Sequence, residues 1–225
     1  MGVRIITYCD KEKNDNNTCN RGNNSCKEQL RSDDEWVDLG LPSGILWAKC
    51  NIGASKPEES GDYFAWGETK PKEIYDWTTY LYMDRDTNFL TKYGPDYNGS
   101  MLNDMDDVSV QVSGGFAHIP SVVNWQELIR HTYPETTTIN GIKGVRLTAS
   151  NGNCIFLPKA GFVDSDKIRD AGLDGNYWCA EILRSHPEYA YFHSLLEDND
   201  CYDLRCKGLS VRAVCRITPS RFFQS

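Results

Sequence analysis

The stretch Gly144-Val145-Arg146-Leu147-Thr148-Ala149-Ser150-Asn151-Gly152-Asn153-Cys154-Ile155-Phe156-Leu157 places two segments rich in strand-forming residues on either side of an Asn-Gly pair. Asn-Gly tolerates the positive φ angles of a type I′ turn. Pro158 and Gly161 then interrupt the second segment. The pattern predicts a tight β-hairpin, so the domain should contain antiparallel sheet.

A helix is predicted immediately before this hairpin. Ser121 follows Pro120 and offers a hydroxyl for the N-cap. Apolar side chains then recur at three- and four-residue spacing, which places them on one helix face: Val122, Trp125, Ile129 and Tyr133. Pro134 is expected to end the helix.

Short strands are predicted on both sides of this helix and hairpin. Upstream they cover part of residues 36–44, then 45–52 and 63–67, and residues 70–117 are expected to be a long loop with a short helix. Downstream they begin at 176 and continue at 189–196 and 208–217. In the last strand Leu209, Val211, Ala213, Cys215 and Ile217 should share one face, with Arg212 and Arg216 on the other. Together these elements predict an α+β domain with long irregular loops.

The composition sets the limits of this domain. With 225 residues, 40% of them hydrophobic, the chain can bury one sizeable core. Residues 1–33 are polar and asparagine-rich and are interpreted as a tail or linker. The domain is expected to span 34–219, followed by a short tail at 220–225.

The charge excludes one class of partner. A net charge of -8 repels phosphate backbones, so nucleic acid is not expected as a ligand. No apolar run reaches the roughly 20 residues of a membrane-spanning helix. Cys9 is followed by Asp10-Lys11-Glu12-Lys13, which is similar to the lipidated start of a bacterial surface lipoprotein. An ordinary polar tail is the alternative to this lipid anchor.

Several segments, taken in order, resemble the major paralogous domain proteins of Bacteroidetes. They are Trp36-Val37-Asp38-Leu39-Gly40-Leu41-Pro42-Ser43-Gly44, Leu46-Trp47-Ala48, Gly61-Asp62-Tyr63-Phe64-Ala65-Trp66-Gly67-Glu68-Thr69, Ile119-Pro120-Ser121, Phe156-Leu157-Pro158, Tyr177-Trp178 and Ser210-Val211-Arg212-Ala213-Val214. That group is similar to the formylglycine-generating enzymes and to the variable proteins of diversity-generating retroelements. The resemblance implies a C-type lectin-like fold, a location outside the cell, and a ligand-binding face just before the last strand.

The predicted binding face lies in residues 179–206. This stretch mixes aromatic, apolar and charged side chains, as protein-binding surfaces do. The candidate ligand-binding residues are Cys179, Glu181, Leu183, Arg184, Ser185, His186, Phe192, Ser194, Asp198, Asn199, Tyr202, Asp203, Leu204 and Arg205. The stretch lacks Trp, Met, Gln and Lys, as adenine-directed mutation of Asn codons would produce, but it contains Glu181, Glu188 and Glu197, which such mutation does not give and which would have to stand at unvaried positions. Ordinary drift of a loop accounts for the same composition.

Four alternatives stay open beside a module that binds a protein or cell-surface ligand. The chain could be a structural surface protein without a dedicated ligand. Cys201 and Cys206 have the Cys-x-x-x-x-Cys spacing with which formylglycine-generating enzymes hold copper(I). Cys179 could be a nucleophile with His186 or His193 as its base. Asp104, Asp106 and Asp107 could supply calcium ligands, although a solvated turn explains this cluster better. The absence of common catalytic motifs favours a non-enzyme without metal or cofactor.

Overall fold

The computed structural model describes residues 35–197 and 199–216, which belong to one compact unit. The predicted tails at 1–33 and 220–225, including Cys9, lie outside the described residues. In chain order the elements are β1 (Trp36–Asp38), β2 (Ile45–Ala48), η1 (Asp104–Asp106), α2 (Val108–Ser113), β3 (Ala117–His118), α3 (Val122–His131), β4 (Thr132–Ile139), β5 (Ile142–Ala149), β6 (Cys154–Pro158), β7 (Phe162–Asp164), β8 (Lys167–Arg169), β9 (Asn176–Ile182), β10 (Tyr189–Ser194), β11 (Asn199–Leu204) and β12 (Val214–Arg216).

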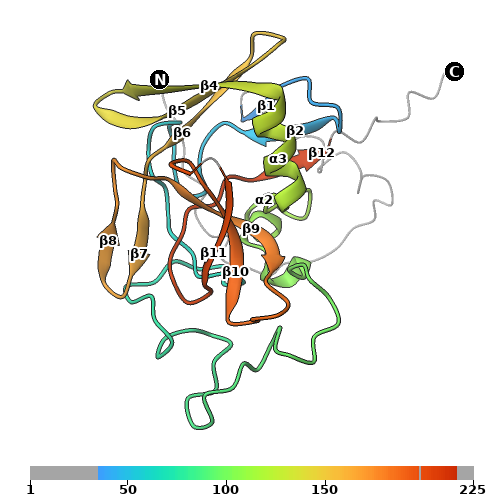
Figure 1. The fold of residues 1–225 in the computed structure, drawn as a ribbon, viewed down its shortest axis with the longest axis vertical. Helices are drawn as coiled ribbons and strands as arrows, with labels where there is room; N and C mark the ends of the chain where they lie inside the picture. The colour runs from blue at the N-terminus through green and yellow to red at the C-terminus, as the bar shows by residue number, and fades with distance from the viewer. Residues whose placement is uncertain (1–34, 198, 217–225) are drawn as a thin grey trace, which may run out of the picture. The chain divides into compact units, whose positions relative to one another are not determined.

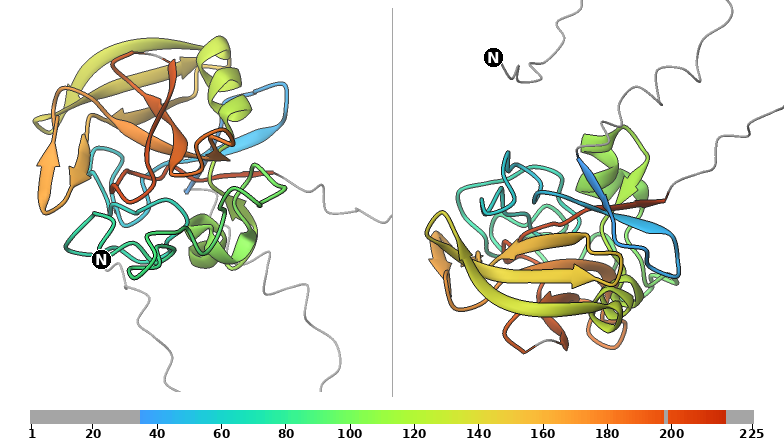
Figure 2. Two further views of the ribbon diagram at one scale, coloured as in Figure 1. Left: turned by 60° about the horizontal axis from the view of Figure 1, so that its bottom comes forward. Right: turned by 90° about the horizontal axis from the view of Figure 1, so that it is seen from above.

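The fold is mostly β, so the predicted α+β, C-type lectin-like class is wrong. Strands make up 38% and helices 10%, and the described residues form twelve strands in four small antiparallel sheets with two α-helices. The sheet orders are β1-β2-β12-β3, β11-β10-β9, β4-β5-β6 and β7-β8 (Figure 1). β2 and β12, far apart in the sequence, pair side by side (Figure 2).

The predicted hairpin is confirmed as β5 and β6, but its turn is not type I′. Asn151 does not adopt a positive φ, and only Gly152 does, at 87°. The type I′ geometry instead occurs at Asn140-Gly141, with φ angles of 49° and 84°, where it joins β4 to β5. β4 was missed because it contains Pro134, and Pro134 is accommodated because β4 is an edge strand.

Helix α3 is confirmed, with an earlier end than predicted. The Ser121 side chain accepts a hydrogen bond from the Asn124 N–H, and the Asn124 side chain accepts one from the Ser121 N–H. These two reciprocal hydrogen bonds form a capping box. The helix ends at His131, and Tyr133 lies 73% exposed on β4 instead of on the helix core face. Trp125 and Leu128 are the fully buried side chains of α3.

Within the described residues 208–216, the predicted strand forms only at Val214–Arg216, and Ile217 lies outside the described residues. Within residues 208–213 the chain makes only isolated β-bridges, including one between Leu209 and Phe64. The same bridge is the only part of the predicted strand at 63–67 that forms. The Arg212 side chain is fully buried instead of lying on an outer face. Its guanidinium donates hydrogen bonds to the Asn51 side chain and to three backbone carbonyls. The alternating sequence pattern predicted that Arg212 faces solvent, but these tertiary contacts take the place of water.

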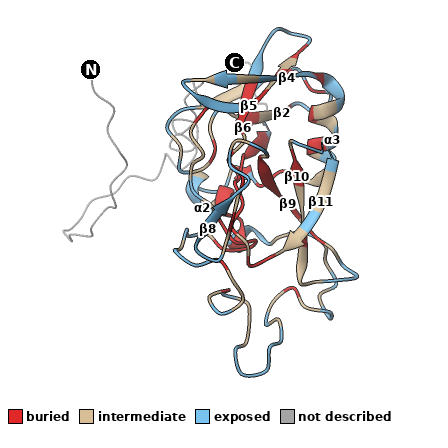
Figure 3. Cartoon of the chain, turned by 60° about the vertical axis from the view of Figure 1, so that its left-hand side comes forward, coloured by how far each residue is buried: buried red, intermediate tan, exposed pale blue. Residues whose placement is uncertain are grey.

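The β11-β10-β9 sheet lies against core on both faces, and β11 is its edge. One face contributes Tyr177 and Cys179 to the cluster around Trp125 of α3, and the other contributes Trp178 to a second cluster around Trp66. Buried residues gather at the centre of the domain, and exposed residues lie at hairpin tips and in the outer loops (Figure 3). No described helix is long and apolar enough to cross a membrane.

Candidate functional site: a pocket between α3 and β11

Side chains of β10 and β11 that point toward α3 form the base of the site. The register of the two strands pairs His193 with Asp200, Tyr191 with Tyr202, and Tyr189 with Leu204. Alternate side chains of a strand lie on the same face, so these three pairs stand in a row. Tyr191 packs against the cluster that contains Trp125, which fixes this face as the one that α3 covers.

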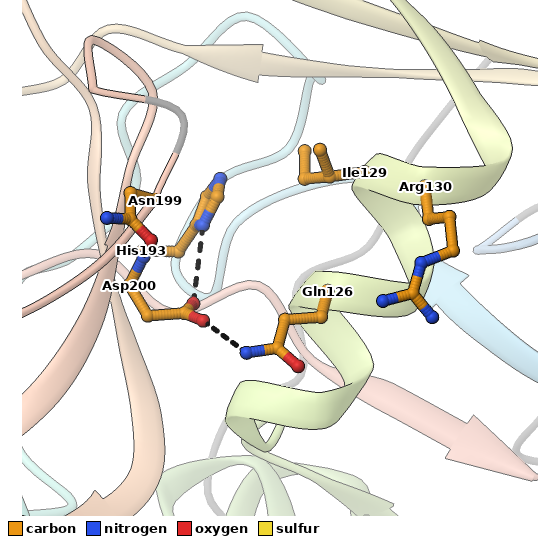
Figure 4. A pocket seen from close by; sticks show the side chains of 6 residues that line it. All are labelled: Gln126, Ile129, Arg130, His193, Asn199 and Asp200. Carbon is orange, nitrogen blue, oxygen red and sulfur yellow. Dashed lines mark hydrogen bonds and ion pairs between the residues drawn. The ribbon is translucent and has the colours of Figure 1, made fainter.

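A pocket of about 250 Å³ opens at the end of this row where His193 and Asp200 lie. One wall is the outer side of α3, with Gln126, Ile129 and Arg130. The other wall consists of His193 from β10 and Asn199 and Asp200 from β11 (Figure 4). The pocket therefore joins a helix and a sheet edge that are about 70 residues apart in the sequence.

A buried His193 and a partly buried Asp200 form a pair in the sheet-side wall. His193 is 2% exposed and stacks on Trp125, with ring centroids 4.6 Å apart and an interplanar angle of 9°. Its Nδ1 lies 3.6 Å from Asp200 Oδ1, and Gln126 Nε2 donates to Asp200 Oδ2 at 2.9 Å. Gln126 thus ties the helix wall to the sheet wall.

Buried polar atoms without hydrogen-bond partners gather around this pair. Among the described residues none accepts from or donates to either ring nitrogen of His193, Asp200 Oδ1 or Trp125 Nε1. An unpaired buried polar atom costs about 1–3 kcal/mol, and native folds retain few of them. Their concentration beside a pocket distinguishes this part of the described chain as a functional site.

The structure places the sequence-predicted residues in three environments. Cys179, Ser194 and Arg205 are buried, and so do not present their side chains to a macromolecule. Arg184, Ser185, His186, Asn199 and Tyr202 are exposed, and Glu181, Leu183, Phe192, Asp203 and Leu204 are partly buried. Asp198 lies outside the described residues. The predicted binding loop at 199–204 is instead strand β11.

Two of the partly buried residues have structural contacts that account for them. The Glu181 carboxylate accepts the N–H of Val122, the first residue of α3, at 3.0 and 3.1 Å, where an anion is favoured by the helix dipole. Burial raises the pKa of Glu181 above its usual range. Phe192 packs edge-on against Trp178, on the sheet face opposite the pocket.

The exposed edge of β11 is protected by its own side chains. The N–H of Asp200 donates to Asn199 Oδ1 at 2.8 Å, and the N–H of Leu204 donates to Asp203 Oδ1 at 2.7 Å. Side chains that occupy edge donors hinder pairing with another strand. Side chains therefore occupy two of the N–H groups along the free edge of β11.

Sequence reasoning missed Gln126, Ile129, Arg130 and Asp200 as pocket residues, and it considered His193 only as a base for Cys179. The i, i+4 spacing of Gln126 and Arg130 places them on one exposed side of α3. Recognising β11 as a strand would also have aligned Asp200 with His193. No local signal indicated that α3 packs across β10.

The cysteines and aspartates considered as metal ligands lie in environments that do not favour metal binding. Burial raises the pKa of Cys201 to about 11 and that of Cys206 to about 12, which disfavours the thiolates that copper(I) needs. Asp106 accepts from the Tyr82 hydroxyl at 2.7 Å, and Asp107 caps α2. Among the described residues no group of three or more His, Cys, Asp or Glu is arranged to hold a metal.

Cys179 is expected to resist alkylation in the folded protein. Its thiol is fully buried, and burial raises its pKa well above the usual range, so little thiolate is present at neutral pH. Iodoacetamide at pH 7.5 should modify the exposed Cys154 while Cys179 stays intact, as read by peptide mass spectrometry. Both should react in urea. Equal rates for the two thiols in the folded protein would restore Cys179 as a candidate nucleophile.

A function has to be proposed from the geometry of the site, because the comparisons with known proteins give no match. The resemblance to the major paralogous domain proteins stays a prediction from the segments quoted above. No family model, no curated protein and no solved structure matches this chain.

Proposed function

We propose that this protein is a ligand-binding module whose contact surface is formed by α3 and β11. The observation that carries the proposal is Tyr202, which is 57% exposed in the strand that borders the pocket. Its ring stands edge-on against Tyr189, with centroids 5.6 Å apart, and Tyr189 contacts His186 in the same manner at 6.3 Å. An exposed aromatic that is already held in place loses little conformational freedom when it binds.

The chemistry of this surface suits a protein or another cell-surface ligand. Tyrosine and arginine supply a large share of binding energy at protein interfaces, and the two elements of this surface carry Tyr202 and Arg130. Specificity would come from side chains, because side chains already occupy two of the N–H groups along the free edge of β11. A cell-surface location is part of the proposal and is supported by the Cys9 segment and by the resemblance.

Variation of residues 179–206, as in the retroelement variable proteins, is proposed only for exposed positions. Arg184, Ser185, His186 and Tyr202 can change without contacting the core. Cys179 and Arg205 are buried, so replacing them would alter the packing that holds the surface. The fold therefore divides the predicted binding stretch into displayed and supporting positions.

Tyr202→Ala is expected to weaken binding by roughly 30-fold, the effect of losing an interface residue worth about 2 kcal/mol. The fluorescently labelled full chain would be applied to an array of purified secreted and surface proteins, and affinities would be measured for those retained. The matched control is Ile168→Ala, which removes an equally exposed apolar side chain (58%) on β8 and should leave affinity unchanged.

Two results would count against the module. Ligands that tolerate Tyr202→Ala but lose affinity with Ile168→Ala would move the contact surface to β8. Retention of no protein at all would favour a structural surface protein without a dedicated ligand.

A further inference from the structure

The two walls of the pocket carry opposite charges that remain separate. Arg130, on the α3 wall, is exposed and makes no ion pair or hydrogen bond with any described residue. Asp200, on the β11 wall, receives one side-chain hydrogen bond, from Gln126, and its Oδ1 has no donor. Figure 4 shows the two side chains on opposite sides of the pocket, with Gln126 between them.

This arrangement restricts the charge of a ligand that fits. A purely anionic ligand is attracted by Arg130 and repelled by Asp200, and a purely cationic ligand meets the reverse. An apolar ligand would cover the partly buried Asp200 without supplying a donor, which is unfavourable for a carboxylate. A molecule with a positive and a negative group satisfies both walls.

Two amide side chains of the pocket each keep one polar group without a partner among the described side chains. Gln126 uses its Nε2 on Asp200, which leaves Oε1 as an acceptor beside that carboxylate. Asn199 uses its Oδ1 on the Asp200 N–H, which leaves Nδ2 as a donor. The Gln126 acceptor thus supplements the acidic residue, whereas the Asn199 donor lies on the β11 wall, opposite Arg130, so that a ligand carboxylate depends on the Arg130 guanidinium.

The volume limits the size of the ligand. A pocket of about 250 Å³ is smaller than the roughly 300–1,000 Å³ typical of sites for drug-sized molecules. It is adequate for a molecule the size of a free amino acid. Ile129, the apolar lining residue, offers a contact for an aliphatic portion of such a molecule.

We propose that this pocket binds a small zwitterion of the free amino acid class. The ligand ammonium group lies against Asp200 and Gln126 Oε1, and its carboxylate lies against Arg130. This inference goes beyond the proposed macromolecule-binding function and does not depend on it, since the charged pocket walls do not include Tyr202.

The probes are the twenty common free L-amino acids, tested singly against the full chain by thermal shift and then by isothermal titration calorimetry. Each amino acid that binds would be compared with its N-acetyl derivative and its carboxamide. We expect at least one to bind, and each derivative to bind at least about tenfold more weakly, since each loses one charge-assisted contact.

Variants of the two pocket walls test which wall causes the weaker binding of each derivative. Arg130→Gln should bring the carboxamide to within about twofold of the free amino acid, while the N-acetyl derivative stays weak. Asp200→Asn should bring the N-acetyl derivative to within about twofold of the free amino acid, while the carboxamide stays weak. Arg169→Gln, which removes an exposed arginine on β8 outside the pocket, should change neither ratio. Circular dichroism and melting would verify folding, and Arg130→Gln suffices alone if Asp200→Asn does not fold.

Failure of this inference is distinct from failure of the proposed function. Binding of no amino acid at 10 mM, or ratios that Arg130→Gln leaves unchanged in a folded protein, would overturn the zwitterion site. Tyr202→Ala should leave amino acid binding intact while weakening a protein ligand, so the two results can be read separately.

Discussion

Arg205→Ala is expected to lower the free energy of unfolding by roughly 3–5 kcal/mol. Arg205 Nε donates to the Tyr80 hydroxyl at 2.8 Å, and its terminal nitrogens donate to the carbonyls of Tyr93, Pro187 and Lys92 at 2.8–3.2 Å. No carboxylate is among these partners. Alanine would leave several acceptors without a donor and a space where the guanidinium was.

The same side chain is surrounded by aromatic rings. The guanidinium carbon lies 5.0 Å from the ring centroid of Trp66, 5.2 Å from that of Tyr80 and 5.7 Å from that of Tyr93. Contacts of a desolvated cation with ring faces contribute about 2 kcal/mol in favourable cases. Arg205 therefore joins the end of β11 to the long loop before η1, and its loss should loosen the strand that carries Tyr202.

Urea denaturation with a global fit would measure the effect. Arg205→Lys keeps the charge but not the planar set of five donors, so it should recover only part of the stability. Arg184→Ala, at an exposed arginine, should stay within about 0.5 kcal/mol of the parent protein. A loss below about 1 kcal/mol for Arg205→Ala would mean that the loop contacts do not stabilise the fold.

Trp125→Ala should destabilise the domain by a similar roughly 3–5 kcal/mol, because it removes the largest fully buried side chain of α3. The Trp125 ring packs edge-on against Trp47 at 4.7 Å and contacts Tyr177 at 5.5 Å. These two residues belong to β2 and β9, so Trp125 connects α3 to two sheets. Alanine would leave a cavity that rigid neighbouring strands cannot fill.

The same substitution should also disturb the pocket. His193 stacks on Trp125, and without that ring nothing holds the imidazole plane beside Asp200. Trp125→Phe retains a ring and should lose about half as much stability or less. Denaturation, together with the near-ultraviolet circular dichroism of the tryptophans, would report both effects. Equal stability of the alanine and phenylalanine variants would show that ring packing at 125 is unimportant.

The local structure of several elements could be predicted because neighbouring residues specify it. Ser121 and the spacing of apolar residues predicted α3, and strand-forming residues around Asn151-Gly152 predicted β5 and β6. β4 was missed because its tolerance of Pro134 depends on an edge position that exists only in the assembled sheet. The fold class was wrong because many of the strands have only three to six residues, too few for a clear alternating pattern, and β12 forms by pairing with the distant β2 and β3.

Much less of the candidate site followed from the sequence. Tyr202 was identified as a surface aromatic, and the structure does expose it. Arg205 has the same charged character in the sequence as Arg184, yet it is buried, because aromatic rings and carbonyls from distant loops replace its water. Gln126 and Arg130 appeared only as the polar side of a helix.

By itself, the sequence determined the cap and core side of α3, the β5–β6 hairpin, and a negative charge that disfavours nucleic acid. These properties depend on residues that are close in the chain or on composition alone. Only the tertiary structure decided which arginines are buried, that 199–204 is a strand, and that Arg130 and Asp200 face each other across a pocket. The first and third outcomes depend on contacts between segments about 70 or more residues apart, and the second on the pairing of β11 with β10, none of which local patterns encode.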